Sequence, residues 1–524
     1  MSFTSLRDLI NTASEQQIPI YQVMLENESE LQKKPIDELK EQMREQIDVM
    51  IESVRQGTTT EVLSKTGITG GDGHRLYEYC KKHASETLVD AFTLSTAANA
   101  MAVNEVNASM GRIVATPTAG SAGILPAVLT HMYDTGDYTK EQLVNVAFTS
   151  SALGLTIANQ ASISGAAGGC QAEIGSATAM AAGALVELRG GTPEQVGNAL
   201  GLALKNSLGL VCDPVAGLVE VPCIVRNGMH AITALVAADM ALAGVRSVIP
   251  PDEVIGAMYD IGNEMPESLR ETGIGGLAGT PTGQSIKEQV FGAHGQLELN
   301  SSATYQSAYE IIGPVMVGPS SSHTAGAVRI GNLARQLLGE EPEEVVFSLM
   351  NSFAETYLGH GTDVALISGV LGFNTFDPEI ADARKLAKDH DLKYHFLQSN
   401  IGNYHPNTVL VDLWGPNKYV TVIASSIGGG KIEVQRLEEY DIKFTAVRPT
   451  LILYYSDAVG LISRLTKYLS EHNINISYMV NERKKINGPA ILVVEIDTPL
   501  NKSQLDQIRT DFPFIDEMQY VQVT

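Results

Sequence analysis

Residues 208–223 read Leu-Gly-Leu-Val-Cys-Asp-Pro-Val-Ala-Gly-Leu-Val-Glu-Val-Pro-Cys, so ten residues separate Cys212 from Cys223. A third cysteine, Cys170, precedes Cys212 with 41 residues between them. Structural zinc sites usually show paired C-x2-C spacing and four ligands, and neither is present. Three thiolates can instead hold three irons of a 4Fe–4S cubane, which leaves the fourth iron open to water or substrate. Spacing alone leaves open the alternative of ordinary buried cysteines, because free cysteine is commonly a core residue.

The residues around Cys170 favour the cluster interpretation. Glycines at positions 165, 168 and 169 leave room beside the thiol, as a large inorganic group needs.

The chain begins Met1-Ser2-Phe3 without the pattern of a signal peptide. We therefore expect a reducing, cytoplasmic compartment, in which its four cysteines form no disulfides.

Length and charge limit the class of protein. The 524 residues suffice for roughly three domains with real hydrophobic cores. A net charge of −24 argues against binding to nucleic acid or to an anionic membrane. The uncharged residues 144–171 are long enough to span a bilayer. Their many polar and small side chains instead predict a buried helix pair in a soluble protein.

Apolar periodicity predicts a multidomain protein. Residues 1–285 read as mostly helical, with an amphipathic helix over 38–55, and polar residues 283–304 read as a linker. Residues 305–445 mix short apolar runs with helical patterns, which is typical of an α/β or α+β domain. The elements expected there are a helix at 325–338 and strands at 345–349 and 409–411.

The last 75 residues, 450–524, predict a separate βαββαβ ferredoxin-like unit. Asn487-Gly488 is a strong hairpin-turn signal within it. The expected strands are 451–455, 475–481, 490–496 and 518–523, and the expected helices are 461–471 and 503–510.

Polar loops ahead of predicted helices are candidates for substrate binding. Residues 319–324, Pro-Ser-Ser-Ser-His-Thr, precede a helix expected from Ala325, and free N–H groups at a helix start bind anions such as a carboxylate. His360 stands between glycines before another expected helix. The loops 116–123 and 64–72 are similar, although each pattern is also that of an ordinary cap or turn. The candidate substrate contacts are Ser64, Lys65, Thr66, Gly67, Thr116, Thr118, Gly120, Ser320, Ser321, Ser322 and Thr324.

Five stretches together resemble the α segment of the bacterial iron–sulfur L-serine dehydratase family. They are residues 164–173, 208–223, 226–227, 116–123 and 270–273. The resemblance implies that Cys170, Cys212 and Cys223 ligate a 4Fe–4S cluster, that Cys80 is structural, and that Asn227 helps to bind substrate. Residues 319–324 and 359–363 resemble the β segment, which implies active-site histidines, His323 and His360, facing the cluster across the domain interface.

Two features depart from the single-chain members of that family. Those members usually place the β segment before the α segment, whereas here α precedes β, as if the two chains of the two-chain type were fused. Some of them also end in a cysteine that reaches the cluster, whereas this sequence ends Val521-Gln522-Val523-Thr524. The fourth iron is therefore expected to be open to substrate.

The C-terminal unit resembles an ACT domain, a small amino-acid-binding module. Residues 456–460 resemble its Asp-x-x-Gly turn, although Val459 stands where many members have proline, and residues 473–476 lead into the second strand. The resemblance implies a homodimer that binds an amino acid, with serine the favoured ligand, between paired domains. A dimerisation module without a ligand is the alternative. The regulatory contacts expected are Asp457, Gly460, Asn475 and Ile476.

The implied reaction converts L-serine to pyruvate and ammonia. Iron coordination would assist departure of the β-hydroxyl, and a positioned base would remove the Cα proton. His323 or His360 is the candidate base, and the sequence does not decide between them. The alternatives are an iron–sulfur hydro-lyase for a hydroxy acid, a pyridoxal-phosphate dehydratase and an amino-acid-sensing regulatory protein.

Overall fold

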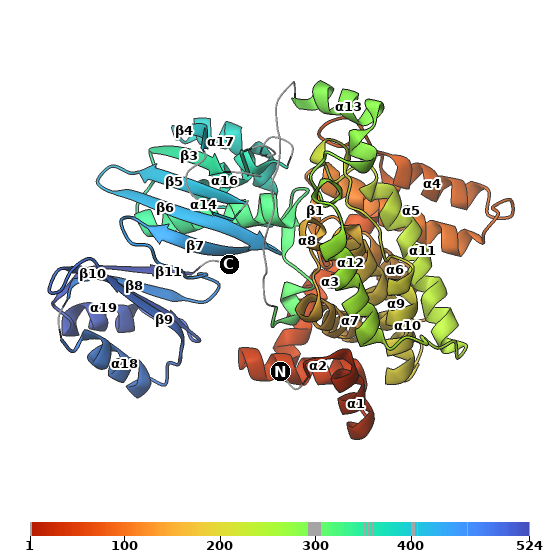
Figure 1. Cartoon of the computed structure of the whole chain (residues 1–524), viewed down its shortest axis with the longest axis horizontal. Coiled ribbons are helices and arrows are strands. Elements are labelled where there is room, and N and C mark those ends of the chain that lie inside the picture. Colours follow the sequence, from red (N-terminus) through yellow and green to blue (C-terminus); the bar gives the residue numbers. More distant parts are fainter. Residues whose placement is uncertain are drawn as a thin grey trace. The chain divides into compact units, whose positions relative to one another are not determined.

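A computed structural model describes residues 3–291, 305–350, 353–354, 357, 360–399, 404–405, 407–457 and 459–522. The chain divides into two compact units. The first comprises Met1–Ser321 with Leu358–His360, and the second comprises Ser322–Tyr357 with Gly361–Thr524. Figure 1 labels the elements of both. A helical N-terminal region followed by a sheet-containing region confirms the multidomain prediction.

The first unit is built almost entirely from helices and carries all four cysteines. Two short strands, β1 (Arg112–Val114) and β2 (Val315–Val317), pair antiparallel within it. Its helices are α1 (Leu6–Gln16), α2 (Ile20–Gln32), α3 (Ile36–Thr59), α4 (Asp72–Lys82), α5 (Ala91–Ala108), α6 (Ile124–Asp134), α7 (Lys140–Gln160), α8 (Gly165–Gly168), α9 (Ser176–Leu188), α10 (Pro193–Lys205), α11 (Cys223–Leu242), α12 (Pro251–Glu264) and α13 (Pro281–Phe291).

Small residues bring the central helices of this unit close together. A side chain on Gly73 would place its Cβ 2.6 Å from the backbone nitrogen of Ala102, and one on Gly57 would lie 2.5 Å from the carbonyl oxygen of Ala102. Helices α3 and α4 therefore approach α5 at one alanine, which larger residues would prevent. Helix α9 is likewise rich in alanine and buried along almost its whole length.

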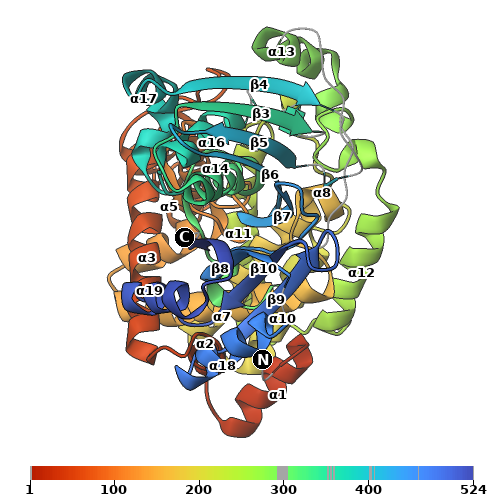
Figure 2. The same cartoon turned by 90° about the vertical axis from the view of Figure 1, so that its left-hand side faces the viewer.

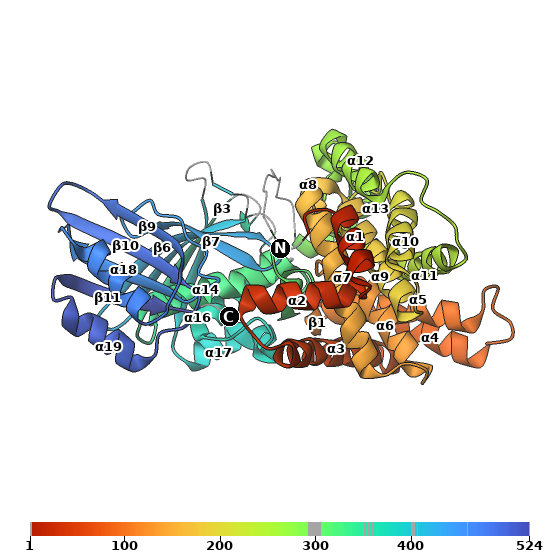
Figure 3. The same ribbon diagram turned by 90° about the horizontal axis from the view of Figure 1, so that it is seen from below.

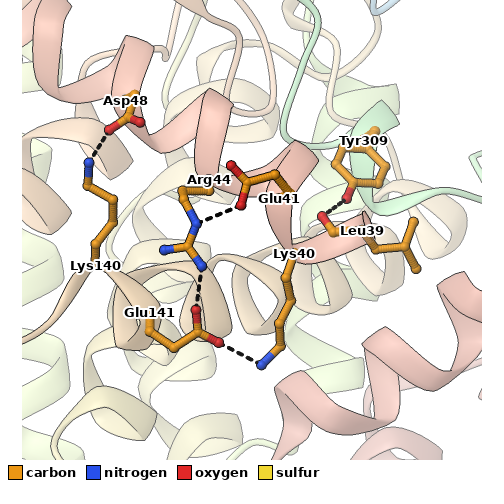
Figure 4. A network of polar contacts seen from close by, with 8 residues as sticks. All are labelled: Leu39, Lys40, Glu41, Arg44, Asp48, Lys140, Glu141 and Tyr309. Carbon is orange, nitrogen blue, oxygen red and sulfur yellow. Dashed lines mark hydrogen bonds and ion pairs between the residues drawn. The ribbon is translucent and has the colours of Figure 1, made fainter. Parts of the chain in front are cut away.

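The amphipathic helix predicted over 38–55 is α3, and its apolar face is buried in the core. At its surface, Glu141 of α7 accepts hydrogen bonds from Lys40 at 2.8 Å and from Arg44 at 2.7 Å (Figure 4). Exposed ion pairs of this kind contribute little free energy each. The Tyr309 hydroxyl also donates to the Leu39 carbonyl at 2.6 Å, which attaches the segment before β2 to α3.

Two predictions about this unit need correction. Residues 144–171 form no helix pair: α7 runs to Gln160, and after a break come the one-turn helix α8 and a π-helix at Gln171–Gly175. The glycines around Cys170 allow this irregular path. The predicted linker begins too early, because α13 continues to Phe291, and residues 292–304 lie outside the described residues. In the part of the chain that the structure describes, no helix is both long and apolar enough to cross a membrane.

The second unit begins with a five-stranded sheet in the order β4-β3-β5-β6-β7, seen side by side in Figure 2. Strands β3 and β4 are parallel and the other neighbours are antiparallel. The predicted strands at 345–349 and 409–411 are β3 and β5. The elements are α14 (Gly326–Leu338), β3 (Glu344–Met350), α16 (Thr362–Leu371), α17 (Ala383–Asp389), β4 (Lys393–Ser399), β5 (Thr408–Trp414), β6 (Tyr419–Gly428) and β7 (Lys431–Leu437).

The last elements follow in the predicted order of strand, helix, two strands, helix and strand. They form a four-stranded antiparallel sheet ordered β11-β8-β10-β9. The two helices cover one face of this sheet, with Leu461, Leu465 and Ile508 in its core (Figures 1 and 3). The bounds are β8 (Thr450–Ser456), α18 (Leu461–Glu471), β9 (Ile476–Arg483), β10 (Pro489–Ile496), α19 (Lys502–Asp511) and β11 (Ile515–Val521).

Candidate metal centre

Cys170 lies where α8 ends and the π-helix begins. The chain turns there at Gly169, whose φ of 75° is a conformation that side chains other than glycine rarely adopt. Both polar atoms of the Gln171 side-chain amide hold this turn in place. Its Nε2 donates to the carbonyl of Met258 at 3.0 Å, and its Oε1 accepts from the N–H of Gly209 at 2.9 Å. The Cys170 thiol is thereby held in the interior.

Cys212 lies in an extended segment that pairs with residues 269–271. Its N–H donates to the Leu269 carbonyl at 2.8 Å, and its own carbonyl accepts from the N–H of Glu271 at 2.7 Å. Cys223 is the first residue of α11. The Cys223 carbonyl accepts from Nδ2 of Asn227 at 2.9 Å. Backbone hydrogen bonds on both sides therefore hold Cys212, and the bond from the Asn227 side chain holds Cys223.

Cys170, Cys212 and Glu173 come together in the interior of the first unit. One ligand atom from each lies within 4.8 Å of the other two, and Cys212 Sγ is 4.0 Å from Glu173 Oε2. A shared hydrogen bond with Cys170, together with burial, raises the pKa of the Cys212 thiol. Burial and the neighbouring Cys170 raise that of Cys223, which lies outside the 4.8 Å group.

The buried carboxyl groups beside these thiols also have raised pKa values. Burial raises the pKa of Glu173 to about 7, and burial together with the charge of Glu173 raises the pKa of Glu271 to about 8. The raised pKa values of Cys212, Cys223, Glu173 and Glu271 mean that these buried groups need more positive charge nearby to be deprotonated. A bound metal would supply that charge and deprotonate the thiols.

The space beside the thiols suits such a group. A Cβ on Gly165 would lie 2.6 Å from Glu173 Oε2 and 3.1 Å from Cys212 Sγ, so a side chain there would enter the thiol and carboxylate cluster. Thiolate donors favour soft metals and iron–sulfur groups. The residues present therefore fit a metal group held mainly by sulfur.

The predicted loop at Ser64–Gly67 lies against the segment between Cys212 and Cys223. The Thr66 hydroxyl donates to Glu220 Oε1 at 2.7 Å, and the Thr69 hydroxyl donates to Oε2 at 2.6 Å. Ser64 is buried and bonds Thr66 at 3.1 Å, whereas Lys65 and Gly67 are exposed. The structure thus brings the hydroxyl groups of this loop, and not its lysine, to the cysteine segment.

The loop after β1 faces Glu173. The Thr118 hydroxyl is hydrogen-bonded to the Glu173 carboxylate, and a Cβ on Gly120 would lie 3.4 Å from Glu173 Oε2. Two asparagines donate to the Gly120 carbonyl, Asn104 at 3.1 Å and Asn227 at 2.8 Å. Asn227 also accepts from the N–H of Gly123 at 3.0 Å, so one side chain joins this loop to α11.

Asn107 connects the same loop to the residues before Ser320. Its Nδ2 donates to the Ala119 carbonyl at 3.1 Å and to the Pro319 carbonyl at 3.4 Å. Thr116 is buried at the start of the loop, where its carbonyl accepts from Ser121 Oγ at 3.1 Å. Asn107 therefore joins the loop after β1 to Pro319, the residue before the candidate Ser320.

The prediction that residues 319–324 precede a helix that begins near Ala325 is wrong. Ser321–Ala325 form a π-helix that runs directly into α14, so these residues lie within the first helical turns and not ahead of them. His323 packs against the Phe353 ring, with centroids 5.5 Å apart. Ser320, Ser321, His323 and Thr324 are buried, and Ser322 is partly buried.

His360 precedes Gly361, whose φ of 64° starts α16 as predicted. The imidazole of His360 is buried, and burial lowers its pKa to about 4. It is therefore neutral near pH 7 and able to accept a proton.

The expected regulatory residues lie at opposite ends of the four-stranded sheet, with Asp457 and Gly460 after the end of β8, and Asn475 and Ile476 at the start of β9. Asp457 forms an ion pair with Arg483 at 2.8 Å, which lowers the pKa of the carboxyl group. Gly460, with φ of 101°, is the residue before α18. Asn475 donates to Asp497 at 2.7 Å, and Ile476 begins β9.

Two functional candidates carry no role in the sequence prediction, Glu173 and Arg226. Glu173 is the only charged residue between Glu141 and Glu187, and a single carboxyl group in so long an uncharged run is a signal that could have identified it. Arg226 donates to Cys170 Sγ at 3.4 Å. These residues are 56 positions apart, so no local sequence pattern predicts the contact.

Comparisons with known proteins identify the family of this chain. A family model described as "Serine dehydratase alpha chain" matches residues 15–278, and one described as "Serine dehydratase beta chain" matches residues 307–394. The "Probable L-serine dehydratase, alpha chain" of Bacillus subtilis (strain 168) is 51% identical over 300 residues, which are 57% of this chain and 99% of the relative. The "L-serine dehydratase, alpha chain" of Peptoniphilus asaccharolyticus is 45% identical over 281 residues, covering 54% and 96%.

A separate relative matches the other part of the chain. The "Probable L-serine dehydratase, beta chain" of Bacillus subtilis (strain 168) is 40% identical over 204 residues, which are 39% of this chain and 93% of the relative. The chain therefore belongs to the serine dehydratase family and joins its alpha and beta segments in one polypeptide.

Proposed function

We propose that this chain converts L-serine to pyruvate and ammonia. Family membership supports the reaction, and the buried group of Cys170, Cys212 and Glu173 is the observation that carries it. Serine loses the Cα proton and the β-hydroxyl as water, which leaves aminoacrylate. Its imine tautomer then takes up one water, so the products are pyruvate and ammonia.

Cys170, Cys212 and Cys223 would hold a 4Fe–4S cluster. When bound, such a group supplies a Lewis-acidic iron that stabilises negative charge on the departing oxygen. The close grouping of Cys170, Cys212 and Glu173 supports this assignment. A metal bound there would deprotonate the buried thiols, although burial raises the pKa values of Cys212 and Cys223. Glu173 is a polar neighbour of the same site and is hydrogen-bonded to Thr118.

The polar loops of the first unit would bind and orient the substrate. Thr66 and Thr69 are held by Glu220, and the Gly120 carbonyl is held by Asn104 and Asn227, so these groups are ordered before substrate arrives. Preorganised hydrogen-bonding groups bind without the entropy cost of ordering a loop. The remaining proposed contacts are Ser64, Lys65, Gly67, Thr116, Thr118, Ser320, Ser321, Ser322 and Thr324.

His323 and His360 are the proposed proton-transfer residues. Burial lowers the pKa of His360 to about 4, so its imidazole is neutral near pH 7 and would be a weaker base than an exposed histidine. Either histidine could take the Cα proton, and the other could then donate a proton to the leaving oxygen.

We further propose three domains: an α-type domain over 1–285, a β-type domain over 305–445 and an ACT domain over 450–524. The strand order β11-β8-β10-β9 with two helices on one face supports a ferredoxin-like ACT fold. In this proposal the chain is a cytoplasmic homodimer, and serine binds between the paired ACT domains as an allosteric ligand, with Asp457, Gly460, Asn475 and Ile476 as the proposed contacts.

A substrate panel tests the reaction. Anaerobically prepared protein is given L-serine, L-threonine and a set of hydroxy acids, and pyruvate and ammonia are both measured. We expect equimolar pyruvate and ammonia from L-serine. Loss of water from a hydroxy acid, with no ammonia from L-serine, would instead identify a hydro-lyase of another substrate class.

A further inference from the structure

Arg226 reaches back from the first turn of α11 to the other two cysteine segments. Its Nη1 donates to Cys170 Sγ at 3.4 Å and to the Val211 carbonyl at 2.8 Å. Its Nη2 donates to Asp213 Oδ1 at 2.9 Å. Because Val211 and Asp213 flank Cys212, one guanidinium joins all three thiol-bearing segments.

The second anchor of this arrangement is Asp213. Its Oδ1 binds Arg226, and its Oδ2 accepts from the backbone N–H of Leu277 at 2.8 Å. The side chains of Arg226 and Asp213 are 16% and 4% exposed, so water and salt screen the pair only weakly. A guanidinium can make these three contacts at once, because its N–H donors form a rigid planar fork. The ammonium group of a lysine has no such fork.

We propose that Arg226 is a positioning residue for the metal centre, which holds the three cysteine segments together and donates an N–H···S hydrogen bond to Cys170. The inference rests on the proposed function, in which Cys170 is a cluster ligand. A hydrogen bond from a cation withdraws electron density from a ligating sulfur and makes an iron–sulfur group harder to oxidise. Dioxygen is the oxidant concerned: it takes one electron from the cluster, becomes superoxide, and leaves an oxidised cluster that releases iron.

Three variants of the intact chain test this role, with one matched control. Arg226→Gln removes the charge and the fork, Arg226→Lys keeps the charge alone, and Asp213→Asn weakens the anchor. Arg55→Gln is the control, because Arg55 pairs with Asp134 at 3.2 Å on the surface, where the two side chains are 58% and 50% exposed. Each protein is prepared anaerobically, and iron and sulfide content, midpoint potential and the rate of cluster loss in air are measured.

We expect Arg226→Gln to have a more negative midpoint potential and to lose its cluster in air roughly ten- to hundredfold faster than the unmodified chain. Arg226→Lys and Asp213→Asn should shift both quantities in the same direction by less, and Arg55→Gln should match the unmodified chain. A purely structural role would alter the amount of cluster bound and leave its potential unchanged.

The two ways of failing are distinguishable. If the unmodified chain binds no iron and sulfide, the proposed function is wrong. If it binds them but Arg226→Gln keeps the same potential and lifetime in air, only the role of Arg226 is overturned. Should Arg226→Gln fail to fold by circular dichroism, unchanged values in both Arg226→Lys and Asp213→Asn overturn it equally.

Discussion

The Thr66 hydroxyl donates a 2.7 Å hydrogen bond to Glu220, which joins the loop after α3 to the segment between Cys212 and Cys223. Glu220 is buried and accepts a second bond, from Thr69, on its other oxygen. A buried carboxylate with two hydroxyl donors holds both in fixed positions. The candidate substrate loop and the candidate metal centre are therefore mechanically connected through one side chain.

Glu220→Gln should weaken substrate binding more than it affects the metal centre. The amide offers one acceptor oxygen in place of two, so Thr66 or Thr69 loses its charge-assisted partner, at a cost of about 1.5–3 kcal/mol. We expect the KM for L-serine to rise roughly tenfold or more, with the iron content unchanged. Glu61→Gln, at an exposed position before the same loop, is the control. An unchanged KM in Glu220→Gln would show that the loop does not contact serine.

The histidines provide a second prediction. His323→Ala and His360→Ala should bind the cluster normally and lose roughly a hundredfold or more in kcat if they transfer protons. The exposed His390→Ala serves as the control and should retain full activity. Steady-state rates and visible spectra measured on the same preparations separate the two effects. Near-normal rates in both variants would mean that His323 and His360 are structural.

The C-terminal unit should control the response to serine. A ligand shifts activity only if it binds the active and inactive states with different affinity, so serine acting there should produce sigmoidal kinetics. Asp457→Asn removes the carboxylate that now pairs with Arg483 and should change the half-saturating serine concentration and the Hill coefficient. Asp506→Asn, on the exposed side of α19, should not. Hyperbolic kinetics in all three proteins would leave only a role in dimerisation.

Stability should depend on pH through Glu105. This buried residue of α5 accepts the N–H groups of Asp72 and Gly73 at 2.7 and 3.1 Å, and burial raises its pKa from 4.5 to about 7. The folded chain then binds a proton more tightly than the unfolded chain. Its contribution is fully present below about pH 4.5 and is lost as the pH rises through 7.

Thermal unfolding of the unmodified chain and of Glu105→Gln across pH 5 to pH 8 measures this effect. The unmodified chain should lose stability relative to the variant as the pH rises, by on the order of 2–3 kcal/mol in total. Parallel melting curves over that range would show that Glu105 titrates normally in the fold.

The sequence predicts most of the regular elements because their periodicity is local. Helix α18 has the predicted bounds, β8 extends one residue beyond the prediction at each end, and β10 begins one residue earlier than predicted. The π-helices at Gln171–Gly175 and Ser321–Ala325 were not predictable in this way, because their composition matches that of an ordinary loop or helix start.

The site is harder to predict than the fold because its contacts join distant segments. Glycine and proline contexts single out Cys170, Cys212 and Cys223, whose role as ligands stays a prediction. The contact of Thr66 with Glu220 spans 154 positions and that of Arg226 with Cys170 spans 56, so both depend on the packing of whole helices.

One measurement tests the central claim most directly: iron, sulfide and L-serine turnover in anaerobic preparations of the chain and of its four cysteine-to-alanine variants. We predict about four irons per unmodified chain, brown colour and pyruvate formation that is lost in air. Cys170→Ala, Cys212→Ala and Cys223→Ala should each abolish turnover, and Cys80→Ala, which changes a buried cysteine outside the site, should retain it. A colourless, iron-free preparation that converts serine at full rate would contradict the account.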